Sequence, residues 1–264
     1  MGLEAHEVVV RFGGLVALDR VSIQAPSGAI TGLIGPNGAG KTTLFNVCCG
    51  YLSPQAGTIR LNSEDVTRLS AVARARAGFG RTFQRLELFW SMTVRENIEI
   101  AIEARSVTDN PLSVLGVSGR SLRQPAVIRR LTDQLLEDVG LSMQSEFAAG
   151  QLTTGQGRLL ELARCLARAP QFLLLDEPSA GLDARETAVL GDLICSLAGE
   201  NGLGVLLVEH DMSLVLRICN EITVLDFGKE LFHGSAEEVR NSPVVQAAYL
   251  GEAELTPFST EIEG

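Results

Sequence analysis

The stretch GPNGAGKTT, residues 35–43, decides what fold this chain adopts. It matches the pattern GxxxxGK[ST] at every fixed position, and it lies between the strand-like AITGLI and the helix-like TLFNVCC. Glycines let a backbone fold closely enough for its N–H groups to surround phosphate oxygens, and a helix N-terminus adds a field that favours anions. The stretch therefore predicts a phosphate-binding loop rather than a simple glycine-rich turn.

Two side chains within this loop have predicted roles in binding a nucleotide. The Lys41 ammonium would contact the β and γ phosphates, and the Thr42 hydroxyl would ligate Mg²⁺. The other loop residues predicted to bind the nucleotide are Asn37, Gly38, Ala39, Gly40 and Thr43.

A second stretch, FLLLDEPSAGLD at residues 172–183, runs four apolar residues into two adjacent acids. Neighbouring carboxylates repel each other, and an apolar setting adds a desolvation cost. A Mg²⁺ ion offsets that cost if the strand ends beside the phosphate loop, because Asp176 can then hold the ion through water. Glu177 is left to orient and polarise an attacking water. Taken alone, the pair is equally typical of a surface turn after a strand.

Length and charge narrow the classes of function. At 264 residues and 45% apolar content, the chain can form one large domain, with or without an inserted subdomain. Its net charge of −10 argues against broad binding to nucleic acid or anionic lipid. We find no signal peptide and no apolar stretch of about 18 residues that could span a bilayer, so we expect any membrane role to come through a partner.

Cysteines and arginines add two weaker expectations. The arginine-rich run ARARAGFGRTFQR at residues 73–85 could bind nucleic acid. Such arginines more often lie on a solvated face, or here in a groove that receives a helix of a membrane subunit. The odd number of cysteines, without CxxC pairs or histidine clusters, indicates neither a disulfide framework nor a zinc site. We expect reduced core residues of a cytosolic protein at Cys48, Cys49, Cys165, Cys195 and Cys219.

The first half of the chain contains segments with clear periodicity. Residues 7–34 read as the strands EVVVRF, VALDRVSIQA and AITGLIG, with turns spaced for antiparallel pairing. A helix should follow from Lys41 to Cys49, and then a short strand at 58–62. Apolar spacing predicts two more helices, at residues 93–105 and 126–139, separated by the loop-like DNPLSVLGVSGRSLRQP.

Helix and strand patterns alternate after residue 155, which implies a sheet covered by helices. The acidic end of the chain, residues 251–264, is expected to be a mobile tail. The alternating segments are RLLELARCLARA (helix), FLLL (strand), ARETAVLGDLICSLAGE (helix), GVLLVE (strand), DMSLVLRICN (helix) and EITVLDFG (strand).

Taken together, these motifs resemble the nucleotide-binding subunit of ABC transporters over nearly the whole chain. GPNGAGKT resembles its Walker A motif, FLLLDE its Walker B motif and SAGLD its D-loop. Gln84 in RTFQ matches the Q-loop glutamine, and His210 after GVLLVE matches the switch histidine. The resemblance implies ATP and Mg²⁺ as cofactors and ATP hydrolysis as the activity.

The same resemblance implies an α/β fold with a RecA-like P-loop NTPase core. An antiparallel β subdomain would form the N-terminal part, and a helical subdomain would be inserted after Gln84. On this basis residues 1–84 and 166–250 make up the core, residues 85–165 the helical signature subdomain, and residues 251–264 the tail.

Three residues take their roles from the resemblance alone. Gln84 would sense Mg²⁺ and the attacking water, although a lone glutamine is more often a surface residue. His210 would contact the γ phosphate, although a histidine at a strand end is more often structural. Phe12 resembles the aromatic residue that stacks on adenine, although aromatic residues in strands usually belong to the core.

The signature motif departs from the family pattern, because this chain has LTTGQ at residues 152–156 in place of LSGGQ. Thr153 keeps the hydroxyl that would meet a γ phosphate, and Gly155 and Gln156 are in place. A β-branched residue at 154 would be strained at positive φ and would cost little in a helix. Helical spacing in QGRLLELARCLARA favours the second case, so we expect activity to survive.

In the family, this signature faces the Walker A motif of a second subunit, so that two ATP molecules lie between two subunits arranged head to tail. This chain carries one motif set, which implies a second ATP-binding subunit, identical or similar. ATP would close the pair and hydrolysis would release it.

Further stretches, among them RFGGLVAL and SPVVQAAYLGE, resemble the ATPase of branched-chain amino acid type importers. That resemblance implies integral membrane permease subunits, an indirect link to an extracytoplasmic substrate-binding protein, no nucleic acid partner, and a peripheral position on the cytoplasmic face of the membrane. The alternative is a soluble ABC-type ATPase with a non-transport role such as iron–sulfur cluster assembly.

Overall fold

The computed structural model describes residues 1–83, 85–109 and 125–250, which fall into two compact units. The first unit joins Met1–Arg74 to the chain from Ile194 onward, and the second unit is Ala75–Leu193. Among the described residues, no helix is both long and apolar enough to cross a membrane. The predicted boundaries after residues 84 and 165 follow the family's subdomains and stay predictions.

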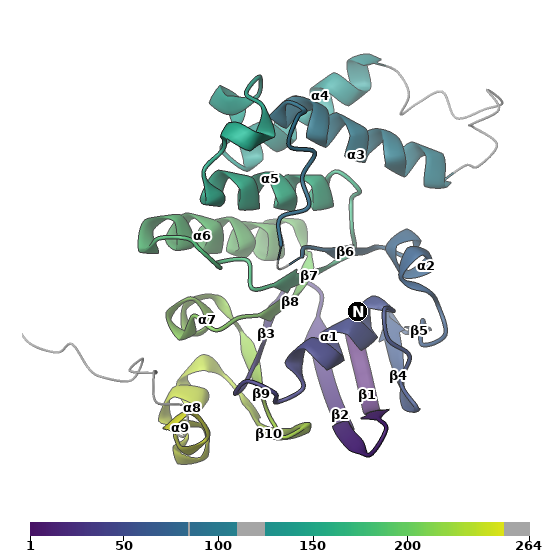
Figure 1. The fold of residues 1–264 in the computed structure, drawn as a ribbon, viewed down its shortest axis with the longest axis vertical. Helices are drawn as coiled ribbons and strands as arrows, with labels where there is room; N and C mark the ends of the chain where they lie inside the picture. Colours follow the sequence, from purple (N-terminus) through teal and green to yellow (C-terminus); the bar gives the residue numbers. More distant parts are fainter. Residues whose placement is uncertain (84, 110–124, 251–264) are drawn as a thin grey trace, which may run out of the picture. The chain divides into compact units, whose positions relative to one another are not determined.

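An antiparallel sheet forms the N-terminal part of the first unit, as predicted (Figure 1). Its strands pair in the order β2-β1-β4-β5, and alternate residues along β1 and β2 are buried, as in a sheet with one face against a core. The strands are β1 (Gly2–Phe12), β2 (Leu15–Pro26), β4 (Ala56–Leu61) and β5 (Glu64–Asp65).

The third strand, β3 (Ile30–Ile34), contradicts the prediction that it pairs antiparallel. It lies between β8 (Gly204–Val208) and β9 (Glu221–Asp226) and is parallel to both, while β10 (Lys229–Gly234) pairs antiparallel with β9. All five residues of β3 are buried, which is typical of a parallel strand covered on both faces. The turn before it therefore leads out of one sheet and into another.

Helix α1 (Lys41–Cys49) begins directly after the phosphate loop and ends, as predicted, at Gly50, which has φ 78°. The glycine takes the left-handed conformation that commonly terminates helices. The first unit also contains the helices α7 (Met212–Ile218), α8 (Ala236–Asn241) and α9 (Pro243–Leu250). Helices α2 (Ala71–Arg76) and α6 (Ala184–Asn201) cross the boundary between the units.

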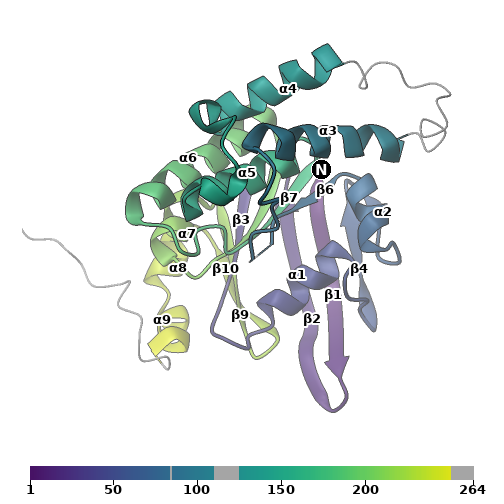
Figure 2. The same cartoon turned by 45° about the horizontal axis from the view of Figure 1, so that its top comes forward.

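In the second unit, β6 (Phe79–Arg81) pairs parallel with β7 (Phe172–Asp176). Three helices accompany this pair: α3 (Val94–Asp109), α4 (Pro125–Asp138) and α5 (Thr154–Leu166) (Figure 2). Two short 3₁₀ turns, Ser142–Gln144 and Ala149–Gln151, connect α4 to α5. The helices predicted at 93–105 and 126–139 are confirmed, and most of the predicted loop between them lies outside the described residues, as does the predicted tail.

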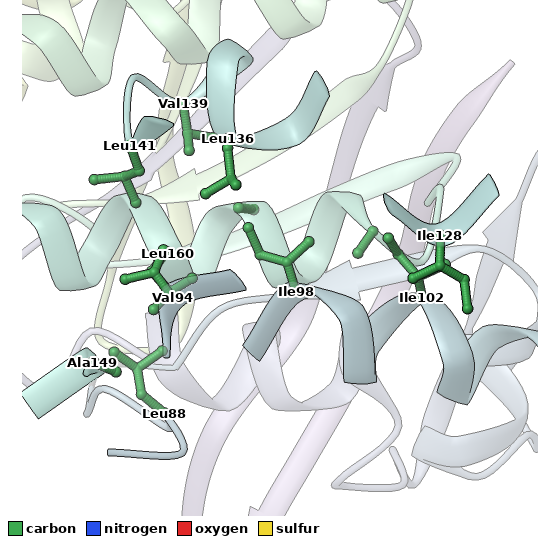
Figure 3. Close-up of a cluster of buried hydrophobic side chains, with 12 residues drawn as sticks. Leu88, Val94, Ile98, Ile102, Ile128, Leu136, Val139, Leu141, Ala149 and Leu160 are labelled. Atoms are coloured by element: carbon green, nitrogen blue, oxygen red, sulfur yellow. The ribbon is translucent and has the colours of Figure 1, made fainter. Parts of the chain in front are cut away.

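One apolar cluster holds these three helices together (Figure 3). Val94, Ile98 and Ile102 follow one another at four-residue intervals on α3 and are almost fully buried. Leu136 from α4 and Leu160 from α5 belong to the same cluster. The i, i+4 spacing that predicted α3 is thus the spacing of the face it buries.

The cysteine prediction is only partly correct. All five cysteines lie in the described residues, and none forms a disulfide. Cys48, Cys49 and Cys219 are buried, and burial raises the pKa of the Cys48 thiol to about 12, so this thiol stays protonated at neutral pH. Cys195, in α6, is exposed, so the prediction of a core residue is wrong there.

Arg74 is also not on a solvated face, contrary to expectation, since only 1% of it is exposed. Its Nη1 donates to the carbonyl oxygens of Val47 and Cys48, at 2.6 and 2.7 Å, in the last turn of α1. Its Nε and Nη2 donate to the carbonyls of Leu69 and Thr67. The guanidinium thus satisfies the carbonyl end of α1, where the helix dipole also favours a positive charge.

We predict that Arg74→Met lowers the free energy of unfolding by about 3 kcal/mol, because it removes the guanidinium that donates to four backbone carbonyls, two of them buried in the last turn of α1. Urea unfolding followed by circular dichroism measures this loss. Arg76→Met, at an exposed position of the same helix, is the control and should change stability by less than about 0.5 kcal/mol. Equal effects of the two substitutions would contradict a capping role for Arg74.

Candidate functional site

The phosphate loop follows β3 and adopts a backbone path that only glycine takes without strain. Gly35, Gly38 and Gly40 have φ values of 147°, 79° and 104°. Gly40 is the N-cap of α1, so the loop delivers the chain directly to the amide end of that helix. This geometry gives anions both backbone N–H donors and the positive end of a helix dipole.

The backbone around the loop also excludes larger residues at two of these glycines. A Cβ atom on Gly35 would lie 2.1 Å from the Leu225 carbonyl oxygen, and one on Gly40 would lie 2.8 Å from the Ala17 carbonyl oxygen. The turn between β9 and β10 supports the loop, because the Gly228 N–H donates to the Ala39 carbonyl at 3.0 Å. This support from β2 and from the β9–β10 turn was not predicted from the sequence.

Lys41 is buried with 6% of its surface exposed, and its ammonium lies across the loop. Its Nζ donates to the carbonyl oxygens of Gly35 at 2.6 Å and Pro36 at 2.9 Å. These contacts place the Lys41 ammonium among the loop amides, where phosphate oxygens would be surrounded. Next along α1, Thr42 is exposed and Thr43 is partly buried, and Asn37 is exposed at the tip of the loop.

His210 lies at the same edge of the sheet as the phosphate loop. Leu33 of β3 pairs with Val208 of β8, so Gly35 and His210 each follow two residues later at the carboxyl ends of neighbouring parallel strands. Glu209, which lies between Val208 and His210 in the chain, is 3% exposed, and its carboxylate accepts the N–H of His210 at 3.0 Å. This buried acid fixes the turn that presents the histidine, a role that sequence reasoning missed.

Phe12 ends β1, where it pairs with Leu15 across the hairpin, and 51% of it is exposed. Its side chain is therefore not part of the core, which was the alternative to stacking on adenine. Contact with a base stays a prediction.

In the second unit, Asp176 and Glu177 come at the end of β7. Asp176 is 7% exposed, and its carboxylate accepts from Arg81 Nη2 at 3.4 Å. Its own N–H donates to the Thr82 hydroxyl at 3.3 Å. Glu177 has φ 47°, a left-handed conformation that is uncommon outside glycine and costs free energy. Such strain is frequent at functional sites because the surrounding fold must hold the residue in place.

The side chains around Asp176 suit a divalent metal that is bound together with the nucleotide. Among the residues that the structure describes, no group of three His, Cys, Asp or Glu side chains could hold a metal ion. A single buried carboxylate, such as that of Asp176, suits Mg²⁺, which keeps several waters and is bound mainly through substrate phosphates. The donor set therefore fits a nucleotide-bound Mg²⁺ rather than a metal caged by protein side chains.

The signature motif forms the N-terminus of α5. Thr153 is the N-cap, and its hydroxyl accepts the Gln156 N–H at 3.2 Å while the Gln156 side chain accepts the Thr153 N–H at 3.1 Å. This reciprocal pair is a capping box. Thr154 is the first residue of the helix and does not have positive φ, so the unstrained case favoured from the sequence is confirmed.

Gly155 is buried where the start of α5 meets the start of α6. A Cβ atom there would lie 2.5 Å from Glu186 Oε1. Glu186 is itself part of the capping box of α6, since its carboxylate accepts the Asp183 N–H at 3.2 Å. The glycine therefore allows the signature helix to approach the segment that follows SAGLD.

Farther along α5, Arg158 and Glu161 form a buried ion pair that sequence reasoning also missed. Arg158 Nη1 lies 3.3 Å from Glu161 Oε2, and both side chains are 6% exposed. Burial raises the pKa of the Glu161 carboxyl, and a hydrogen bond from the Phe83 N–H and the charge of Arg158 oppose this rise. The i, i+3 spacing of opposite charges in RLLE was the available signal.

Most of the predicted site residues thus have definite positions within their own units. The first unit brings the phosphate loop and His210 to one edge of its sheet, and the second brings Asp176, Glu177 and the start of α5 into one packed body. Gln84 lies outside the described residues. The roles assigned to these side chains remain predictions.

Comparison with known proteins identifies the class. A family model described as ABC transporter matches residues 18–180, and one described as branched-chain amino acid ATP-binding cassette transporter matches residues 229–254. A solved structure of an ATP-binding cassette of an ABC transporter, in its ADP conformation, has TM-score 0.81 and 30% identity, covering 95% of this chain and 98% of that one. The chain therefore belongs to the ABC transporter family, and the predicted α/β fold is confirmed.

Two curated relatives narrow the assignment within that family. The high-affinity branched-chain amino acid transport ATP-binding protein BraF of Pseudomonas aeruginosa is 41% identical, over 95% of this chain and 98% of the relative. LivG of Salmonella typhimurium, which has the same description, is also 41% identical over 95% of this chain and 98% of its own length. The chain is an ABC transporter ATPase of the branched-chain amino acid type, as the sequence indicated.

We predict that Thr154→Gly changes ATP turnover by less than about fivefold, the factor that corresponds to the roughly 1 kcal/mol cost of glycine in a helix. The reason is that residue 154 is already helical, so a glycine relieves no strain. Phosphate release by the purified transporter complex measures the turnover. A rise well beyond that factor would show that threonine impairs the signature.

Proposed function

We propose that this chain binds MgATP and hydrolyses it to power uptake of branched-chain amino acids, or of related small polar solutes, through membrane subunits. The observation that carries the proposal is the likeness over 95% of the chain to ATP-binding proteins of branched-chain amino acid transport. The phosphate loop and the two acids at the end of β7 supply the chemistry that this activity requires.

Binding of the triphosphate falls to the first unit in this proposal. Backbone N–H groups of residues 37–43 surround the phosphates, and Lys41 places its charge beside the β and γ phosphates. The lysine already lies across the loop, so it exchanges carbonyl partners for phosphate oxygens without a large movement. Phe12 offers an exposed aromatic face for adenine.

Hydrolysis requires a group that orients water opposite the bond that breaks. Thr42 and Asp176 would hold Mg²⁺, which neutralises developing charge on the phosphates. Glu177 accepts a proton from the attacking water as a general base. Its left-handed backbone conformation sets the direction in which its side chain leaves the chain. His210 contacts the γ phosphate, on a turn that Glu209 holds.

The N-terminus of α5 provides the reason to propose a second ATP-binding subunit. Thr153 and Thr154 are exposed at this amide end, which favours an anion, and in the family the signature faces the phosphate loop of a second subunit. We therefore propose a head-to-tail pair, homodimeric or heterodimeric, in which each signature meets the nucleotide of the other subunit. The pair would bind integral permease subunits on the cytoplasmic face of the membrane and couple indirectly to an extracytoplasmic binding protein.

Affinity purification of the tagged chain from detergent-solubilised membranes tests the transport assignment. We expect permease subunits to copurify, and leucine uptake into proteoliposomes that contain this complex to require internal ATP. Recovery of the chain with soluble iron–sulfur assembly proteins, and without permeases, would support the alternative of a non-transport ATPase.

We predict that Glu177→Gln slows ATP hydrolysis by at least about a hundredfold while the complex still binds ATP, because the amide cannot accept the proton of water. Trapped nucleotide in the complex and released phosphate give the two measurements. Glu146→Gln, at an exposed carboxylate of the same unit, is the control. Lys41→Ala should instead abolish productive ATP binding, which separates the two roles. Normal turnover in the Glu177 variant would remove this residue from catalysis.

A further inference from the structure

We infer that the segment Arg81–Phe83 couples helix α5 to Asp176, and that Arg158 and Glu161 are the positioning residues that make this coupling. The inference rests on the proposed function, because it assigns α5 to the nucleotide of the partner subunit and Asp176 to the nucleotide of this chain. All of the contacts that carry it lie within the second unit.

The connection to α5 consists of two hydrogen bonds to one backbone residue. The Phe83 N–H donates to Glu161 Oε1 at 3.1 Å, and Arg158 Nη1 donates to the Phe83 carbonyl at 2.9 Å. The ion pair between the two side chains closes the arrangement. Both polar groups of the Phe83 backbone are thus bound by side chains one turn apart on the same helix, so Phe83 moves with α5.

A third contact strengthens the connection two residues earlier. The Cys165 thiol, one turn beyond Glu161 on α5, donates to the Arg81 carbonyl with a sulfur–oxygen distance of 2.9 Å. Contacts at both ends of a three-residue segment prevent it from rotating about a single attachment. The segment therefore follows both translation and tilt of the helix.

The connection to Asp176 begins in the same segment. Arg81 pairs with Leu174 between the parallel strands β6 and β7, and the Thr82 N–H donates to the Leu174 carbonyl at 3.1 Å. The Thr82 hydroxyl accepts the Asp176 N–H, and the Arg81 guanidinium lies 3.4 Å from the Asp176 carboxylate. Thr82 thus binds the backbone of Asp176 and Arg81 binds its side chain, and both residues belong to the segment that α5 contacts.

Stability alone gives a weak reason for such an ion pair. Removing two charges from water costs several kcal/mol per ion, and well-packed apolar side chains in their place are often as stable or more stable. An apolar pair could not bind the N–H and the carbonyl of one backbone residue at once. The geometry of the pair therefore points to positioning of the Phe83 backbone as its contribution.

The consequence is communication between two nucleotides. When the partner's ATP meets Thr153 and Gly155 at the start of α5, a shift of the helix moves Phe83, Thr82 and then Asp176. Binding at one nucleotide site would thereby adjust the metal-holding residue of the other, with the helix as the shared element.

The test replaces both charges together, as Arg158→Met/Glu161→Leu, because a double apolar change leaves no unpaired buried charge. The control is Arg95→Met/Asp133→Leu, which removes an ion pair of 2.7 Å from the surface of the same unit without contact to Phe83. Both variants are purified as the full transporter complex, and their thermal unfolding is recorded as a check on folding.

Two measurements distinguish positioning from a merely structural role. In steady-state kinetics we expect kcat to fall about tenfold, the scale of a small misplacement of a reacting group, while KM for ATP changes less than about twofold. In the Glu177→Gln background, which holds ATP without turnover, amide hydrogen exchange of the peptide containing Asp176 should slow when ATP is added. That slowing should disappear in the double variant and persist in the control.

A conservative substitution keeps the test decisive if the double variant does not fold. Glu161→Gln retains an acceptor for the Phe83 N–H and should preserve most of the slowing, whereas Glu161→Leu should lose it. Unchanged kcat and unchanged exchange in the variants would overturn the coupling. An unmodified complex that neither binds nor hydrolyses ATP would instead overturn the proposed function.

Discussion

The architecture depends on the close approach of three backbone segments at the phosphate loop. Gly35 and Gly40 have no room for a Cβ atom, because the carbonyls of Leu225 and Ala17 lie where it would be placed. This contact fixes β2 and the β9–β10 turn against the loop, and the loop in turn sets where α1 begins. A larger residue at Gly35 or Gly40 would separate these segments before it affected any ligand.

Several buried charged side chains are bound by backbone atoms and not by an opposite charge alone, whereas the Asp176 carboxylate accepts from the Arg81 guanidinium. Lys41 and Arg74 donate to carbonyls, and Glu209 accepts N–H groups of the turn that follows it. Backbone partners compensate for lost solvation and also define a chain path. The charges therefore shape the loops on which the proposed chemistry depends, which explains why several of them surround the motifs without belonging to them.

Local patterns predicted the elements well, and long-range pairing less well. The phosphate loop, α1 with its end at Gly50, and the helical start of the signature were all evident from spacing and residue type. The partners of β3 were not, because a run of buried residues shows that a strand is central without showing which strands flank it. Arg74 and Glu209 were missed for a related reason: their partners are backbone atoms, which leave no trace in the residue types of a sequence. The Arg158–Glu161 pair has a signal in its i, i+3 spacing, but that spacing shows neither its burial nor its hydrogen bonds to the Phe83 backbone.

The left-handed backbone of Glu177 has an implication for evolution and engineering of this chain. Glycine or asparagine would occupy that conformation at lower cost, so stability by itself favours replacing the glutamate. A search for heat-resistant variants that scores only folding would select against this residue, and under the catalytic role proposed for Glu177 the most stable variants would not hydrolyse ATP. The strained backbone at Glu177 thus marks a position where stability and the proposed activity favour different residues.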